Sequence, residues 1–335
     1  MILGAGMKRR ELMVGLGAAA AWSLAARAQP TDRMRRIGVL IGGTAESDLE
    51  GQARIAAFRQ SLQKLGWIDG RNVRIEIRWS AANSDNVRKY AAELAKLAPD
   101  VILASGASTV GILLQTTRTI PVVFVSVADP VGAGYVDSLA HPGGNATGFM
   151  QYEYNLTAKW LELLKQVAPR ATRVAVLRDA TVSAGIGQFA VIQAAAPSLG
   201  LDVRPVNVRD SAEIDRTITA FANAGGDGLI VTGSAPAQVH RELILSLAAK
   251  HKLPAVYWAR FMVQGGGLIS YGPNIIEQYR QTTTYIDRIL KGEKPNDLPV
   301  QAPVSYELAI NLKTAKTLGI EVPLSLQQRA DEVIE

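Results

Sequence analysis

Short runs of aliphatic and β-branched residues alternate along the chain with longer stretches in which apolar residues recur every three or four positions. Residues 37–41 form the first such run, and residues 52–65 follow it with Ile55, Phe58 and Leu62 at helical spacing. Alternation of strand-like and helix-like patterns is typical of βα units that build a parallel sheet. The sequence therefore predicts an α/β fold.

The order of these patterns occurs twice, which predicts two similar α/β lobes. In the first half, strand-like runs at 73–79, 101–104 and 122–127 surround a helical pattern at 87–97. In the second half, residues 173–177 correspond to 36–40, residues 227–233 to 100–106 and residues 253–256 to 120–123. The alternative is the general self-similarity of parallel-sheet proteins, which share this layout without a duplication.

The chain is expected to cross between the lobes more than once. The turn-rich segment 145–148 is the first predicted crossing, a helix is predicted at 275–290, and 304–310 reads as a final strand. The N-terminal lobe is thus expected to comprise residues 29–148 plus about 275–303. The C-terminal lobe is expected to comprise 149–274 plus about 304–335. Several crossings predict a hinge with a cleft beside it, and not two domains on a flexible tether.

Composition narrows the classes of protein that are possible. The 335 residues are 48% hydrophobic and 20% charged, which is ordinary globular usage. Cysteine is absent from the whole sequence. Disulfide scaffolds, thiolate metal sites, thiol nucleophiles and a lipid-modified cysteine anchor are therefore excluded.

The N-terminus carries the pattern of an export signal. Basic residues at 8–10 precede an uncharged run at 12–26, and residues 26–28 read Ala-Arg-Ala, a signal peptidase pattern. The run is too short to span a bilayer. We expect residues 1–28 to be cleaved, with a buried N-terminal helix as the alternative; the paired arginines at 9–10 resemble a twin-arginine leader. Removing this leader lowers the net charge from +6 to +3, which favours no nucleic-acid partner.

Catalytic and metal-binding motifs are missing from the sequence. The dinucleotide, phosphate-loop, zinc-protease and nucleophile-elbow patterns do not occur, and His141, His240 and His251 are scattered. We therefore expect a protein that is not an enzyme, with no catalytic residue, no metal and no cofactor. The alternative is an exported α/β enzyme that uses Asp129 or Asp179 as a base.

Glycine and hydroxyl residues follow four of the predicted strands, at 42–44, 105–109, 126–130 and 233–235. In open parallel sheets, ligands bind beyond the carboxyl ends of the strands, where helix N-termini favour negative charge. The alternative is that these residues only cap helices and start turns. The candidate ligand contacts are Thr44, Ser105, Gly106, Ala107, Ser108, Asp129, Asp179 and Ser234.

Aromatic residues lie at the corresponding edge of the second half. Tyr257, Phe261 and Tyr271 are candidates for an apolar wall over a ligand. The alternative for these three residues is packing in the hydrophobic core. For Trp258, which follows Tyr257 in the sequence, packing in the core is the preferred interpretation.

A set of short motifs, in a fixed order over nearly the whole chain, resembles a known family. The motifs are KRRE at 8–11, IPVVF at 120–124, DPV at 129–131, GGNATG at 143–148, GGLISYG at 266–272, ILKGEKP at 289–295 and ADEVI at 330–334. Together they resemble the bacterial ABC-transporter substrate-binding proteins that are similar to tryptophan and tyrosine uptake receptors. The resemblance implies a type I periplasmic-binding fold, with two Rossmann-like lobes, a three-strand hinge and a ligand trapped between the lobes.

The resemblance also implies how such a protein works. A small organic ligand would be captured in the periplasm and delivered to an ABC permease; a sensor for a membrane signalling protein is the alternative. The absence of cysteine predicts a receptor without a lipid anchor, and a monomer is expected because nothing in the sequence indicates an oligomer. The family's ligand contacts map onto the loops named above. Amino-acid-binding members have a small residue and an acid after the Thr-Gly turn, whereas residues 149–152 here read Phe-Met-Gln-Tyr. An aromatic or branched carboxylate is therefore expected at least as much as an amino acid.

Overall fold

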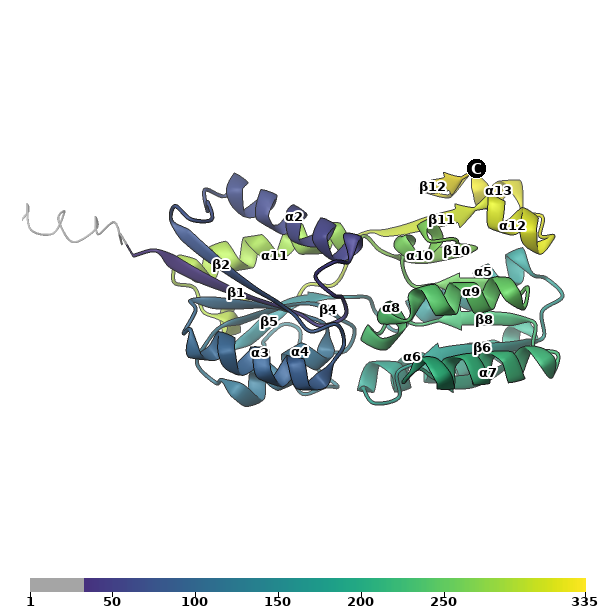
Figure 1. Cartoon of the computed structure of the whole chain (residues 1–335), viewed down its shortest axis with the longest axis horizontal. Coiled ribbons are helices and arrows are strands. Elements are labelled where there is room, and N and C mark those ends of the chain that lie inside the picture. Colours follow the sequence, from purple (N-terminus) through teal and green to yellow (C-terminus); the bar gives the residue numbers. More distant parts are fainter. Residues whose placement is uncertain (1–32) are drawn as a thin grey trace, which may run out of the picture. The chain divides into compact units, whose positions relative to one another are not determined.

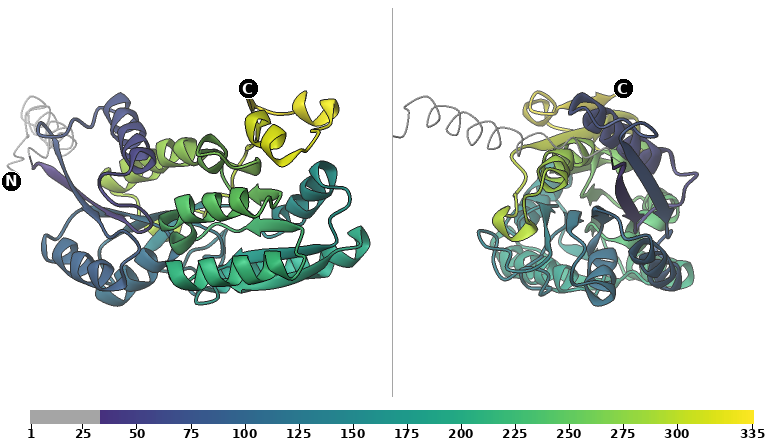
Figure 2. Two further views of the ribbon diagram at one scale, coloured as in Figure 1. Left: turned by 45° about the vertical axis from the view of Figure 1, so that its right-hand side comes forward. Right: turned by 90° about the vertical axis from the view of Figure 1, so that its left-hand side faces the viewer.

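The structure is a computed structural model that describes residues 33–335, and the predicted leader at 1–28 lies outside the described residues. The described chain is built around two sheets, each flanked by helices (Figure 1). The helices and strands are drawn from two further directions in Figure 2. Within residues 33–335, no helix is long and apolar enough to cross a membrane.

The first sheet contains five parallel strands, and we call this sheet with its helices the first lobe. Helices α2 and α11 lie on one face of the sheet, and α3 and α4 lie on the other (Figure 1). The strand order is β2 (Val73–Trp79), β1 (Arg35–Ile41), β3 (Val101–Ser105), β4 (Val122–Val127) and β5 (Ala146–Met150), and the helices are α2 (Leu49–Lys64), α3 (Ser84–Lys96), α4 (Ala107–Thr116) and α11 (Ile275–Leu290).

The second sheet contains seven strands, and with its helices it forms the second lobe. All neighbouring strands are parallel except the β10 and β11 pair. The strand order is β12 (Glu332–Ile334), β11 (Tyr306–Asn311), β10 (Ile269–Pro273), β9 (Ala255–Tyr257), β8 (Gly228–Val231), β6 (Arg173–Arg178) and β7 (Asp202–Asn207). The helices are α5 (Leu156–Val167), α6 (Ser183–Ala195), α7 (Ser211–Asn223), α8 (Ala235–Val239), α9 (Arg241–Lys250), α10 (Arg260–Gln264), α12 (Leu312–Leu318) and α13 (Leu324–Gln327), with a short 3₁₀ turn at η1 (Ala196–Leu199). A second 3₁₀ turn, η2 (Pro295–Asp297), lies against β5 of the first lobe.

The apolar runs of the sequence form strands that are buried on both faces. In β1, the side chains of Val39 and Ile41 pack in one hydrophobic cluster, and Leu40, which lies between them in sequence, packs in the other. Successive side chains of a strand point to opposite faces, so covering both faces with helices demands a continuous apolar run. This explains why residues 37–41 do not alternate with polar residues.

Three crossings connect the lobes, and hydrogen bonds join two of them. The first crossing follows β5, the second is Asn274 between β10 and α11, and the third lies between η2 and β11. The Met150 N–H donates to the Gln301 carbonyl at 2.8 Å, and the Gln301 N–H donates to the Gly148 carbonyl at 2.9 Å. The Gln278 side chain of α11 donates to the Met150 carbonyl at 2.6 Å. The hinge is therefore a hydrogen-bonded unit.

Two local expectations differ from the structure. The turn-rich segment 145–148 leads directly into β5, so the chain leaves the first sheet only after Met150. Gly148 is required here for close packing, because a Cβ on it would lie 2.1 Å from the carbonyl oxygen of Phe124. The strand predicted at 304–310 is β11, and it is not the last, because β12 pairs with it in parallel.

Substituting Gly148 should destabilise the hinge side of the first sheet. We expect Gly148→Ala to lower the free energy of unfolding by about 1–3 kcal/mol, because the new methyl group meets the backbone of Phe124. Urea unfolding measures this difference. The matched control is Gly144→Ala four residues earlier, where no atom lies within 4 Å of the added Cβ. Equal stability of the two variants would contradict the close approach.

Candidate functional site

A cavity lies between the lobes, where the carboxyl ends of strands from both sheets meet. About 80 Å³ of it is open to the centre of a water-sized sphere, which corresponds to about five to eight water molecules. That space suits one small organic molecule. Of the residues expected from the sequence, the ones that line it are Ser105, Gly106, Ala107, Ser108, Asp179 and Ser234.

The β3–α4 loop brings an uncapped helix N-terminus to the cavity. Gly106 adopts φ +94 as the N-cap of α4, and this residue supplies no side-chain hydrogen bond to the first N–H groups of the helix. The first N–H groups of a helix have no partner inside the helix, and they carry the positive end of its dipole. The backbone at Ala107 and Ser108 is therefore suited to hold an anionic group.

Arg54 is a buried cation in the lining that the sequence analysis did not identify. It belongs to α2 and is only 4% exposed. Its Nε lies 3.2 Å from the Glu50 carboxylate, and its guanidinium lies 5.4 Å from the ring centroid of Phe261 in the second lobe. Gln238 of α8, also in the second lobe, accepts from Nη1 at 3.0 Å and Nη2 at 3.1 Å in the amide orientation that satisfies both groups.

Tyr279 links Arg54 to the β3–α4 loop. This residue of α11 is fully buried, its hydroxyl is close enough to Arg54 to feel its charge, and it donates that hydroxyl to Ser105 Oγ at 2.6 Å. Burial raises the pKa of Tyr279 although Arg54 and Ser105 act to lower it, so the phenol stays protonated at neutral pH. Because Ser105 Oγ accepts from Tyr279, its own proton is free to be donated to a ligand.

Ser126 is a strained residue in the cavity lining. It lies in β4 at φ +59, where the register between β4 and β5 shifts. Its Oγ is buried and, among the described residues, has no hydrogen-bond partner. A non-glycine residue with positive φ costs free energy, and such strain is found preferentially at binding sites. No sequence pattern indicates this conformation; the predicted loop at 126–130 only places Ser126 after a strand.

The second lobe contributes one acidic side chain and one large aromatic side chain. Asp179 Oδ1 accepts from the N–H and hydroxyl of Thr181 at 2.9 and 2.6 Å. A Cβ on Gly185 would lie 1.9 Å from the Asp179 carbonyl oxygen, so α6 begins in close contact with this loop. Trp258, interpreted as core from the sequence, is 2% exposed and lines the cavity. It is the aromatic wall residue.

The remaining expected residues lie outside this lining. The Thr44 side chain is buried beside α2, Tyr257 is buried in β9, and burial raises the pKa of Tyr257. Phe261 packs edge-on against Trp258 with ring centroids 5.5 Å apart, and so supports the wall from behind. Tyr271 packs against Tyr306, 5.8 Å between centroids.

Asp129 also lies outside the lining, and its carboxylate is held by other contacts. Oδ1 accepts from the Gly132 N–H at 2.8 Å, and Oδ2 accepts from the Tyr154 hydroxyl at 2.7 Å. Burial first, and then the neighbouring Asp129, raise the pKa of Tyr154, which keeps its hydroxyl a donor. Sequence alone places Asp129 in the correct loop but does not reveal these partners.

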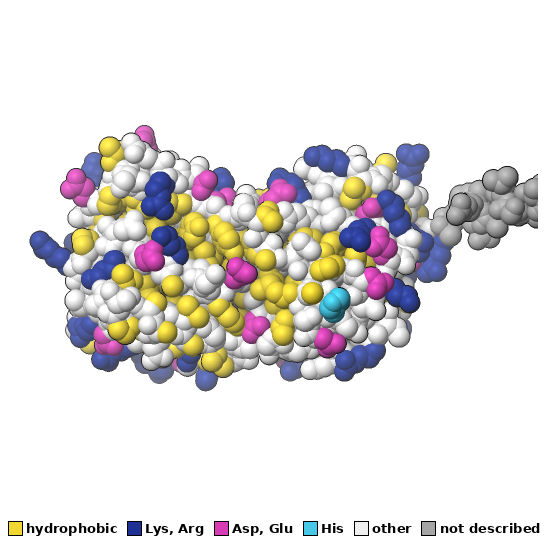
Figure 3. Space-filling view, turned by 180° about the vertical axis from the view of Figure 1, so that it is seen from behind, with side chains coloured by type: hydrophobic (Ala, Val, Ile, Leu, Met, Phe, Trp, Pro, Cys, Tyr) yellow, Lys and Arg dark blue, Asp and Glu magenta, His cyan; other side chains and the backbone are white. Residues whose placement is uncertain are grey.

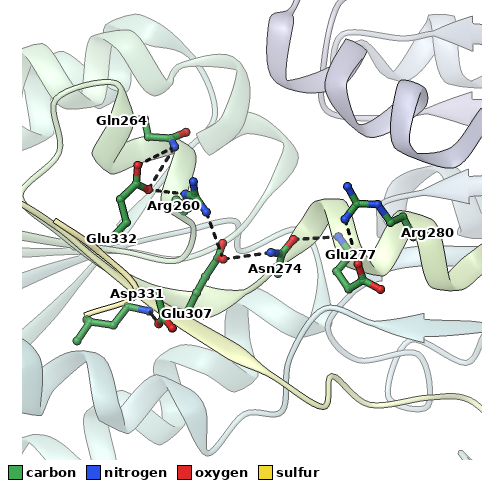
Figure 4. A network of polar contacts seen from close by, with 9 residues as sticks. Arg260, Gln264, Asn274, Glu277, Arg280, Glu307, Asp331 and Glu332 are labelled. Atoms are coloured by element: carbon green, nitrogen blue, oxygen red, sulfur yellow. Dashed lines mark hydrogen bonds and ion pairs between the residues drawn. The ribbon is translucent and has the colours of Figure 1, made fainter. Parts of the chain in front are cut away.

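A polar network lines a second cavity near the hinge (Figure 4). Asn274 caps α11 by accepting from the Glu277 N–H at 2.9 Å, and its amide donates to Glu307 at 3.2 Å. Burial raises the pKa of Glu307, although Arg260 lies 3.7 Å away and opposes the rise. This network ties the second crossing to β11 and holds the hinge side of α10, from which Phe261 extends.

Charges of both signs are mixed on one face of the molecule. On the face shown in Figure 3, Lys and Arg side chains are interspersed with Asp and Glu around a central hydrophobic area. Mixed signs produce no extended field of one sign on that face.

Fold and cleft define a two-lobe binding protein of the type I periplasmic-binding class. The chain belongs to the ABC transporter substrate binding protein family, whose sequence profile matches residues 49–334. This family is one of binding receptors and not of enzymes.

Known proteins that are similar to this chain include the following. A tyrosine-binding protein of Clostridioides difficile (strain R20291) is 25% identical over 270 residues, which cover 79% of this chain and 76% of that protein. An ABC domain from Streptococcus pneumonia, solved in complex with L-Trp, is 26% identical with a TM-score of 0.83 over 90% of this chain and 100% of that one. A ligand-free, open substrate binding protein from Clostridium difficile is 24% identical with a TM-score of 0.66 over 90% and 99%.

The strain at Ser126 predicts a stabilising substitution inside the cavity. We expect Ser126→Gly to raise the free energy of unfolding by about 1–2 kcal/mol, because it removes both the positive-φ strain and a buried unpaired hydroxyl. Urea unfolding measures the gain. Lys252→Gly is the control: it is an exposed residue at φ +51 far from the lining, and should gain only about 0.5 kcal/mol. A Ser126→Gly variant less stable than the parent would refute the assigned strain.

Proposed function

We propose that this protein is the periplasmic receptor of an ABC transporter for a small organic carboxylate with an apolar, preferably aromatic, body. The observation that carries the proposal is the clustering of anion-binding groups in the cavity: the uncapped start of α4, Ser105 and the buried Arg54. Loaded and closed, the receptor would dock on the permease. The leader pattern at 1–28 supports export to the periplasm.

The orientation of the ligand follows from the distribution of charge in the lining. The carboxylate would lie at the start of α4, between the hydroxyl of Ser105 and the guanidinium of Arg54, since charge-assisted bonds contribute about 1.5–3 kcal/mol each. Trp258 would cover the apolar body from the second lobe. Asp179, across the cavity, would accept an ammonium group if the ligand carries one.

The similar proteins favour aromatic amino acids as the first ligands to test. One relative is named for tyrosine, and another was solved with L-Trp. The whole-chain TM-score is 0.83 to the L-Trp complex and 0.66 to the ligand-free open structure. The arrangement of the lobes here is thus nearer to the ligand-bound one, which agrees with a cavity enclosed by both lobes.

The decisive experiment is native mass spectrometry of residues 29–335 as purified and after addition of L-tryptophan, L-tyrosine and indole-3-propionate. We expect a 1:1 complex with at least one of these carboxylates, and a higher melting temperature in its presence. At a hundredfold excess over Kd, binding stabilises the folded state by about 2.7 kcal/mol. The uncharged indole-3-propanol is the control, and equal binding of this alcohol would contradict recognition through a carboxylate.

Arg54 and Asp179 should have separable effects on affinity. We expect Arg54→Gln to weaken binding of every carboxylate by about 10- to 150-fold, the loss of one charge-assisted bond. Because this change leaves Glu50 without its cation, the double variant Glu50→Gln/Arg54→Gln tests the same loss without a stranded charge. Isothermal titration calorimetry provides the affinities.

Asp179→Asn separates an amino-acid ligand from a simple carboxylate. Its affinity should fall for L-tryptophan and stay unchanged for indole-3-propionate, because only the first carries an ammonium group. Equal losses for both compounds would show that Asp179 shapes the cavity and does not recognise the ammonium.

A further inference from the structure

Asp48 and Arg241 join the two lobes at the edge of the cleft without lining the ligand cavity. Asp48 precedes α2 of the first lobe, and its Oδ1 accepts from the Gly51 N–H at 2.8 Å as the cap of that helix. Its Oδ2 lies 2.5 Å from Nη1 of Arg241, the first residue of α9 in the second lobe. The side chain of Asp48 is 7% exposed and that of Arg241 is 27% exposed.

A second contact joins the lobes elsewhere along the cleft. The Tyr154 hydroxyl, from the segment just before α5, donates to Asp129 of the first lobe at 2.7 Å. Its ring packs against α6 so closely that a Cβ on Gly187 would lie 2.6 Å from Cζ. Asp129 therefore contacts the opposite lobe with the carboxylate that the sequence analysis assigned to a ligand.

Both contacts depend on the arrangement of the lobes. Three of the four side chains are fixed within their own lobe: Asp48 by its cap, Asp129 by Gly132 and Tyr154 by its packing on α6. Arg241 donates to the Gln238 carbonyl of its own lobe at 3.5 Å. Separation of the lobes therefore breaks the contacts instead of stretching them. Asp48 is mostly shielded from solvent, so salt screens its attraction to Arg241 less than it screens an exposed ion pair.

We propose that the Asp48–Arg241 ion pair and the Tyr154–Asp129 hydrogen bond latch the lobes in the closed arrangement, whether or not the cavity is occupied. These residues then determine the apparent affinity for any ligand, because that affinity scales with the fraction of receptor in the binding-competent state. The latch itself does not depend on the proposed ligand class; only its effect on affinity rests on the proposed function.

The test measures the distance between the lobes in the ligand-free protein. The natural sequence has no cysteine, so Ala92→Cys on α3 and Ala220→Cys on α7, both exposed, provide two unique sites for spin labels. Pulsed electron paramagnetic resonance then gives the populations of short and long separations. Asp48→Asn removes the charge and keeps a good cap, Arg241→Gln removes the partner, and Tyr154→Phe removes only the hydroxyl.

We expect the parent to populate the short separation, and Asp48→Asn and Arg241→Gln each to raise the long-to-short ratio about 5- to 30-fold, a typical effect of losing one or two kcal/mol. Tyr154→Phe should act in the same direction with a smaller effect, and Arg241→Lys should restore part of the closed population. The control Asp202→Asn breaks an exposed ion pair within β7 and should change nothing. If the latch variants give the same distribution of spin-label distances as the parent, the proposal is overturned, whether the parent is mainly closed or mainly open.

A second readout separates the latch from direct ligand contact. If L-tryptophan and indole-3-propionate bind, Asp48→Asn should weaken both by one common factor, whereas Asp179→Asn should discriminate between them. Unequal losses caused by Asp48→Asn would contradict an effect on closure alone. Failure of both compounds to bind would count against the proposed ligand class and leave the spin-label result to decide the latch.

Discussion

The cleft is organised around the buried guanidinium of Arg54. A cation removed from water is tolerated only where its charge is compensated and its N–H groups are bonded. Here Glu50 supplies the charge, Gln238 accepts hydrogen bonds, the Tyr279 hydroxyl lies nearby, and Phe261 offers the face of its ring. These partners come from α2, α11, α8 and α10, so satisfying one side chain requires both lobes and the recrossing helix to meet.

This requirement explains why the chain crosses the hinge three times. Helix α11 follows β10 of the second sheet in sequence but packs on the first sheet, where it brings Tyr279 to Ser105 beside Arg54 and Gln278 to the Met150 carbonyl at the end of β5. A chain that crossed only once would have no element positioned to do both. The hinge and the binding groups thus share one helix, and a displacement of α11 relative to the first sheet would alter both together.

The sequence predicted the architecture more completely than the site. Hydrophobic periodicity identifies strands such as β1 because a sheet covered on both faces leaves a continuous apolar run. The loops that follow strands were also identified, since the carboxyl ends of parallel strands converge at one edge. Four consecutive residues, 105–108, line the cavity because they span the end of β3 and the start of α4, with only Gly106 between the two elements.

The residues that sequence reasoning missed owe their place to tertiary contacts. Arg54 is one of many arginines and lies inside a helix, where a charge ordinarily faces solvent. Only contacts with residues up to 225 positions away in the chain, such as Tyr279, bury it. The sequence favours a core position for Trp258 because a tryptophan in the core and a tryptophan in a cavity wall have the same sequence pattern. Only the position of the opposite lobe decides whether a cavity lies beside the ring.

Asp129 lies in a loop that the sequence identifies, but its carboxylate contacts protein groups and does not line the cavity. A carboxylate at the end of a strand is equally suited to a ligand ammonium, a turn N–H or a hydroxyl of the other lobe, and the last two are satisfied here by Gly132 and Tyr154. In a receptor that closes on its ligand, groups that bind the ligand and groups that bind the opposite lobe act on the same equilibrium. Selection for affinity therefore acts on both sets, and a residue can move from one to the other without a change of fold.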